Sequence, residues 1–182
     1  MVKYYTEINN KAFEGTIIDI ESDGDFDRQY SDNDSRQYKK IVPVIFGYIT
    51  KDNLNIFCAK GHSSIDKLKH IIIETLPELK IPLYAFNSRF ERSVLYHSCD
   101  LKINFKCELN AWSREMKKYT VENLNIENYD DPFFDVGNEC RLAWLRGEWD
   151  QCIKHNRSCL LKERDILLKR GFREPDDLTF HP

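Results

Sequence analysis

Two carboxylates lie one residue apart in an otherwise apolar run, Gly15-Thr16-Ile17-Ile18-Asp19-Ile20-Glu21. The β-branched residues predict a strand, and residues i and i+2 of a strand project from the same face. Asp19 and Glu21 would then point together, which is costly in a partly buried place unless a cation lies between them. Carboxylate oxygens suit Mg²⁺ or Mn²⁺. The spacing therefore indicates a divalent-metal site on a strand, although two solvated acids at a strand end would give the same pattern.

A second polar cluster, Asn87-Ser88-Arg89-Phe90-Glu91, follows the apolar run Ile81–Phe86 at a predicted change from strand to helix. Glu91 would lie in the first helical turn, where its carboxylate could join Asp19 and Glu21. A purely structural role accounts for the same residues, because Asn87 or Ser88 could cap the helix and an acid is favoured near its N-terminus.

Charge is distributed unevenly along a chain whose net charge is −3. Residues 19–34 contain seven acids and one base, whereas residues 154–173 contain seven bases and two acids. An acidic metal site bordered by a basic helix suits an enzyme that cleaves phosphodiesters, because ions bind the reacting phosphate and side-chain cations neutralise its neighbours. Ordinary solvated surface charge is the alternative for these residues taken singly.

The elements that must position these residues alternate between strand and helix. Turn residues and apolar periodicity predict strands at 16–21, 41–50, 54–59 and 81–86, a weaker strand near 103–109, and helices at 63–76, 88–98 and 151–170. The strands at 41–50 and 54–59 should form a hairpin, and residues 22–40 should form a polar loop. This order predicts an α/β fold, a mixed sheet flanked by helices, in a single domain covering residues 1–182.

Composition limits the class of protein. The 182 residues, 41% of them hydrophobic, suit one packed domain, and no apolar run approaches the ~20 residues that span a bilayer. The N-terminus lacks the apolar core of a signal peptide, and the six cysteines form no disulfide-type framework. We therefore expect a cytoplasmic protein with reduced thiols and no membrane partner.

Together, the motifs resemble the ribonuclease H-like 3′–5′ exonuclease superfamily with four acidic metal ligands, in particular its predicted prokaryotic branch. The resemblance rests on the D-x-E motif at 19–21, the N-x-x-F-D/E motif at 87–91, and His155-Asn156-Arg157-Ser158-Cys159, which matches a Tyr/His-Asn-x-x-Asp segment. It spans roughly residues 15–170. It implies a ribonuclease H-like fold, hydrolysis of phosphodiester bonds in DNA or RNA, Mg²⁺ or Mn²⁺ as cofactor, and a single-stranded nucleic-acid end as partner.

The resemblance also implies roles for individual residues. Asp19 would bridge two metal ions, while Glu21 and Glu91 complete their coordination shells. His155 would orient and deprotonate the attacking water. Apart from the resemblance, charge and position suggest Asn87, Arg89, Arg157 and Lys162 as contacts to nucleic acid, with ordinary solvated side chains as the alternative.

One position departs from the pattern, because Cys159 stands where the superfamily has its last aspartate. A thiol is a poor ligand for Mg²⁺ and favours softer metals. Glu163 shares a helical stripe with His155 and Cys159 and could supply the missing carboxylate. Alternatively, Cys159 is a packed helix residue in a catalytically weakened module that binds nucleic acid or a protein partner without cutting. The sequence leaves both interpretations open.

Overall fold

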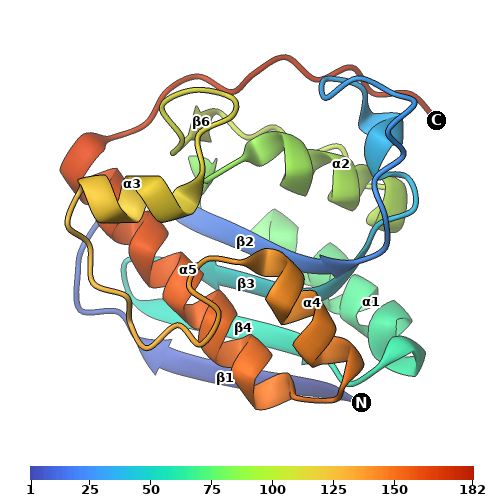
Figure 1. Cartoon of the computed structure of the whole chain (residues 1–182), viewed down its shortest axis with the longest axis horizontal. Helices are drawn as coiled ribbons and strands as arrows, with labels where there is room; N and C mark the ends of the chain where they lie inside the picture. Colours follow the sequence, from blue (N-terminus) through green and yellow to red (C-terminus); the bar gives the residue numbers. More distant parts are fainter.

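A mixed six-stranded sheet forms the centre of the computed structural model, which describes all 182 residues (Figure 1). Its strand order is β1-β4-β3-β2-β5-β6. Adjacent strands in the run β1-β4-β3-β2 are antiparallel to each other. Strand β5 pairs in parallel with β2 on one side and with β6 on the other. The strands are β1 Val2–Ile8, β2 Thr16–Asp23, β3 Val42–Ile49, β4 Asn53–Ala59, β5 Leu83–Ala85 and β6 Cys107–Glu108.

Helices cover both faces of this sheet (Figure 1). One face packs against α1 (Ile65–Thr75) and α2 (Ser88–Cys99), and the other against α4 (Gly137–Leu145) and α5 (Trp149–Arg170). The short helix α3 (Lys117–Asn123) lies beside α5. None of the helices has the apolar length needed to cross a membrane. The expected α/β architecture, a mixed sheet flanked by helices, is confirmed.

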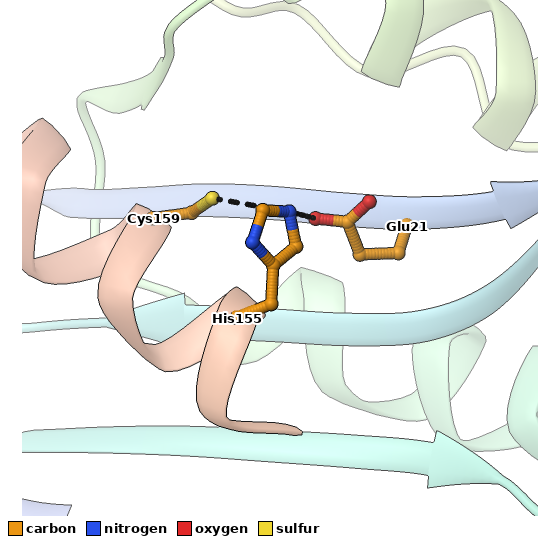
Figure 2. Close-up of side chains that lie close together, drawn as sticks. All are labelled: Glu21, His155 and Cys159. Atoms are coloured by element: carbon orange, nitrogen blue, oxygen red, sulfur yellow. Dashed lines mark hydrogen bonds and ion pairs between the residues drawn. The ribbon is translucent and has the colours of Figure 1, made fainter. Parts of the chain in front are cut away.

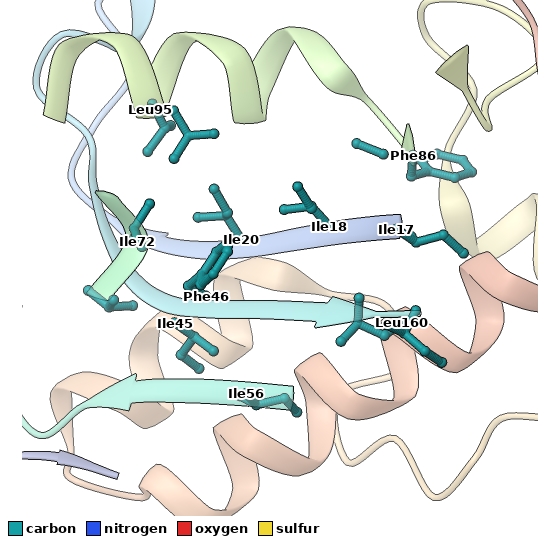
Figure 3. Packing of buried hydrophobic residues seen from close by; sticks show 14 of the residues in the cluster. Ile17, Ile18, Ile20, Ile45, Phe46, Ile56, Ile72, Phe86, Leu95 and Leu160 are labelled. Atoms are coloured by element: carbon teal, nitrogen blue, oxygen red, sulfur yellow. The ribbon is translucent and has the colours of Figure 1, made fainter. Parts of the chain in front are cut away.

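The core lies on both sides of the central strands, which explains why β3 is a nearly continuous apolar run and why the first five residues of β2 are all buried. Ile18 and Ile20 of β2 point towards α2, where Leu95 lies, whereas Ile45 of β3 points towards the opposite layer of helices (Figure 3). All four side chains are buried. Consecutive residues of β2 thus alternate between the two layers, and the odd-numbered positions face α5.

The predicted hairpin and the helices at 63–76, 88–98 and 151–170 are confirmed with small shifts at their ends. The predicted loop at 22–40 begins two residues too early, because β2 continues to Asp23, and it contains a short 3-10 helix at Ser35–Tyr38. The strand near 103–109 shrinks to Cys107–Glu108. Sequence reasoning missed β1, an edge strand whose side chains are only partly buried, and α3.

Candidate functional site

A cavity of about 520 Å³ opens beside the middle of β2. Its lining includes the three carboxylates predicted to converge, Asp19 and Glu21 from β2 and Glu91 from α2. Side chains from α3 and α5 complete the wall, among them Lys117, His155 and Cys159. Gly137, Asn138 and Arg141 of α4 also line it, so the site draws residues from five elements, β2, α2, α3, α4 and α5.

The backbone of β2 aims Asp19 and Glu21 at the layer of α5, as the i and i+2 spacing predicts. Asn156 of α5 donates its amide Nδ2 to Oδ2 of Asp19 at 2.7 Å and to the Asp19 carbonyl at 3.2 Å. The register of β2 against β3 shifts directly after Glu21. Such a bulge bends a strand and re-aims its side chains, and bulges are common beside functional sites.

Gly47 of β3 makes this close approach of α5 possible. It pairs with Asp19 across the sheet, and a Cβ atom at position 47 would lie 2.0 Å from Oδ1 of Asn156. A glycine inside a strand often marks such a close approach. The glycine in the run Ile41–Thr50 was therefore a sequence signal for the site that was not used.

Glu91 enters the cavity from the first turn of α2, and its Oε2 has no hydrogen-bond partner. Burial, followed by the charges of Asp19 and Glu163, raises the pKa of Glu91 well above its ordinary value. Asn87 precedes α2 but makes no capping hydrogen bond, and its buried Oδ1 is also unpartnered. The capping interpretation of Asn87 is therefore wrong, and its side chain lines the cavity instead.

Lys117, the first residue of α3, brings a cation into the acidic cluster. Its Nζ lies 3.0 Å from Oδ1 of Asp19 and also contacts a carboxylate oxygen of the fully buried Glu163. Burial opposes the charge of Lys117, but Asp19, Cys159 and Glu163 together raise its pKa well above the usual range. Burial likewise raises the pKa of Glu163, and Lys117 partly offsets this. Sequence reasoning missed Lys117 because residues 100–135 carry no regular pattern.

His155 joins the cavity to a second acidic residue, Asp131. Its Nδ1 lies 2.7 Å from Oδ1 of Asp131, and its Nε2 lies 3.3 Å from Oε1 of Glu21 and 3.7 Å from Sγ of Cys159 (Figure 2). Burial opposes the imidazolium, but Cys159, Glu21 and Asp131 raise the pKa of His155 well above its ordinary value. Asp131 thus fixes the ring so that Nε2 faces the cavity. It was not predicted, because it lies in an irregular loop.

Cys159 and Glu163 occupy different parts of the site. The thiol of Cys159 is buried beside His155, and burial raises its pKa to about 11, so it is uncharged at neutral pH. Ligand atoms of Glu21, His155 and Cys159 all lie within 4.8 Å of one another. Glu163 lies deeper, against Lys117 and near Asp19. The carboxylate that faces Asp19 from α5 is therefore Glu163.

The basic residues of α5 do not frame the cavity as expected. The Lys162 side chain is completely buried, and its Nζ is 2.8 Å from Oδ2 of Asp131 and 2.9 Å from Oδ1 of Asp135. The prediction that Lys162 contacts nucleic acid is therefore wrong, because its ammonium cannot reach a phosphate. Arg157 instead pairs with Glu7 of β1 at 2.7 Å.

Arg89, the other base predicted to contact nucleic acid, is also occupied inside the protein. It is 8% exposed, and its guanidinium donates to the carbonyl of Ser113 at 3.2 Å. Of the four residues predicted to touch substrate, only Asn87 lines the cavity.

No family model matches the chain, and neither a curated protein nor a solved structure shows significant similarity to it. The site is therefore judged on its own geometry.

The donor set fits a hard divalent cation. Seven carboxylates gather in and behind the cavity, namely Asp19, Glu21, Asp25, Glu91, Asp131, Asp135 and Glu163. The basic groups among them are the ammonium groups of Lys117 and Lys162, the imidazole of His155 and the guanidinium groups of Arg28 and Arg141. Oε2 of Glu91 and Oε2 of Glu163 are buried without a partner, which is costly for carboxylates unless a cation is bound.

Proposed function

We propose that this protein is a metal-dependent nuclease, a ribonuclease H-like 3′–5′ exonuclease that hydrolyses phosphodiester bonds in DNA or RNA with Mg²⁺ or Mn²⁺. The observation that carries the proposal is that Asp19, Glu21 and Glu91 line the same cavity, with a buried carboxylate oxygen of Glu91 left unpartnered. Two separate sequence motifs, one on a strand and one on a helix, supply these residues.

The order of the elements supports the same proposal. The strand that carries D-x-E lies inside the sheet, with the β3–β4 hairpin on one side and the parallel strand β5 on the other. β5 leads directly to the N-x-x-F-E segment on α2, and the last motif lies on α5 against β2. This is the arrangement that the resemblance to the ribonuclease H-like superfamily implies.

In this proposal, Asp19, Glu21 and Glu91 hold the cation, which would act as a Lewis acid and lower the pKa of a bound water. The neutral form of His155, which its raised pKa makes the minor form at neutral pH, would accept a proton from the attacking water at Nε2, while Asp131 at Nδ1 keeps the ring in place. The water oxygen bonds to phosphorus as the bond from phosphorus to the 3′-oxygen breaks. The leaving 3′-oxygen would take up a proton and become a hydroxyl. The products are a 5′-phosphorylated nucleotide and a shortened strand with a 3′-hydroxyl.

A second function is favoured by two specific observations. Cys159 replaces a carboxylate, and the Lys117 ammonium already neutralises part of the acidic cluster. Both features suit a ribonuclease H-like module that binds nucleic acid, or a protein partner, without cutting.

Cleavage of short single-stranded oligonucleotides distinguishes the two functions. DNA and RNA strands labelled at either end should lose nucleotides from the 3′ end with Mn²⁺ or Mg²⁺ and stay intact with EDTA. Asp19→Asn, which keeps the shape of the side chain, should reduce the rate by roughly 100-fold or more. Asp66→Asn, at an exposed position on α1, is the matched control and should cleave normally. Binding without cleavage under every metal condition would favour the non-cutting module.

A further inference from the structure

We infer that the ammonium group of Lys117 takes the place of one of the two cations expected in this site, so that the protein binds a single divalent ion beside it. The inference rests on the proposed nuclease function and deepens it. It differs from the expectation that Asp19 bridges two metal ions.

The first argument is the position of Lys117. Its Nζ is 3.0 Å from Oδ1 of Asp19 and contacts Glu163, so one positive charge lies between two carboxylates. Its side chain is only 16% exposed, and its Nζ lies 5.7 Å from the centre of the Phe86 ring. Lys117 is therefore packed into the site, unlike a solvated surface lysine. Lysine carries a compact point charge, which suits it to replace a small cation.

The second argument concerns the two oxygens of Asp19. Oδ1 accepts a hydrogen bond from Lys117, and Oδ2 accepts one from Nδ2 of Asn156 at 2.7 Å. A carboxylate that bridges two metal ions needs lone pairs of both oxygens directed at those ions. One N–H donor is already on each oxygen, and Lys117 occupies the position between Oδ1 of Asp19 and Glu163 that a second ion would take.

The third argument is the room left around Asp19. The unpartnered Oε2 of Glu91 and the neighbouring Glu21 line the cavity and are available to an ion. On the side of Glu163, the ammonium of Lys117 already supplies a positive charge. One divalent ion balances Glu21 and Glu91, the two carboxylates that Lys117 does not contact.

Counting bound Mn²⁺ tests the inference without relying on activity. Isothermal titration calorimetry and the loss of the free Mn²⁺ signal in electron paramagnetic resonance should both give one ion per chain for the wild-type protein. Lys117→Ala should bind two, and two ions roughly 4 Å apart should show a spin-coupled spectrum. Lys118→Ala, at the adjacent exposed position, is the matched control and should bind one.

The outcomes separate this inference from the proposed function. Two ions in the wild-type protein, together with cleavage, would overturn the role of Lys117 and leave the nuclease in place. One ion in both the wild-type protein and Lys117→Ala would also overturn it. Binding of no ion, together with no cleavage, would remove the nuclease function itself. Lys117→Met, which keeps the aliphatic part of the side chain and removes the charge, should also bind two ions, so the test does not depend on the folding of Lys117→Ala alone.

Discussion

Each polar side chain of the site is held by a partner from another element. Asn156 of α5 holds Asp19 of β2, and Asp131 of the preceding loop holds His155. Fixed hydrogen bonds of this kind keep reacting groups within a narrow range of positions, as catalytic sites require. Glu91 and Asn87 are exceptions, because Oε2 of Glu91 and Oδ1 of Asn87 have no partner among the protein's own groups, whereas Glu163 contacts Lys117. This contrast identifies Glu91 as the residue most directly available to a bound cation.

Substitutions at the two candidate fourth ligands should differ in effect. Glu163→Gln removes the charge beside Lys117 and Asp19, so Mn²⁺-dependent cleavage should fall by roughly 100-fold. Cys159→Ser should be tolerated, because the thiol it replaces is uncharged. Cleavage assays at saturating Mn²⁺ measure both, with Glu122→Gln on the exposed side of α3 as control.

Cys159→Asp provides the opposing test. A large gain in activity would show that the natural protein is a weakened enzyme. Equal and negligible effects from all three substitutions would mean that neither residue serves as the fourth ligand.

A separate prediction concerns the buried ion pair of Lys162 with Asp131 and Asp135. Lys162→Met should lower the free energy of unfolding by about 3–5 kcal/mol, because two buried carboxylates lose their partner. Urea denaturation measures this, and Lys154→Met at an exposed position of the same helix should have little effect. A loss near that of the control would contradict the structural role assigned to Lys162.

At the scale of elements, local motifs explain which parts of the site could be predicted. Asp19, Glu21 and Glu91 were predictable because each lies at a defined place on a strand or in a first helical turn. Lys117 and Asp131 were not, because their position depends on how an irregular segment folds back across the sheet. The same distinction holds for the fold, where periodic helices were predicted and the partly exposed strand β1 was missed.

The contact between α5 and β3 yields a prediction at this scale. Gly47→Ala places a Cβ 2.0 Å from Oδ1 of Asn156 and 2.9 Å from Cδ1 of Leu160. One of the two elements must shift, so the substitution should destabilise the protein by about 1–3 kcal/mol and weaken Mn²⁺ binding. Thermal unfolding and calorimetry measure these effects.

A double-mutant cycle shows whether the clash is the cause. Gly47→Ala should cost less in an Asn156→Ala background, because the nearest clashing atom is gone. Equal costs in both backgrounds would assign the destabilisation to some other feature of β3.

For the whole molecule, the charge asymmetry of the sequence serves mainly to hold the tertiary structure together. Arg157 binds Glu7, Arg170 binds Glu115, and Arg173 binds Glu108, so bases near the C-terminus tie distant segments to the domain. These pairs leave few of the basic residues free for phosphate. Arg28, the single base of the acidic segment, is exposed, lines the cavity and makes no ion pair.

Arg28 should therefore carry the electrostatic contact to a nucleic-acid strand that enters the cavity. For single strands, each phosphate contact contributes about −0.7 to the slope of log affinity against log salt concentration. Arg28→Ala should flatten the measured slope by roughly that amount, whereas Arg157→Ala should leave it unchanged. Fluorescence anisotropy of a short labelled oligonucleotide, with Ca²⁺ in place of a catalytic metal and a series of salt concentrations, measures the slope. Lys67→Ala, at an exposed position on α1, is the control for a base remote from the cavity lining.

An unchanged slope in Arg28→Ala, or a flattened one in Arg157→Ala, would place the strand elsewhere on the molecule. Binding that ignores salt altogether would indicate that nucleic acid is not the partner, because phosphate neutralisation always releases counterions.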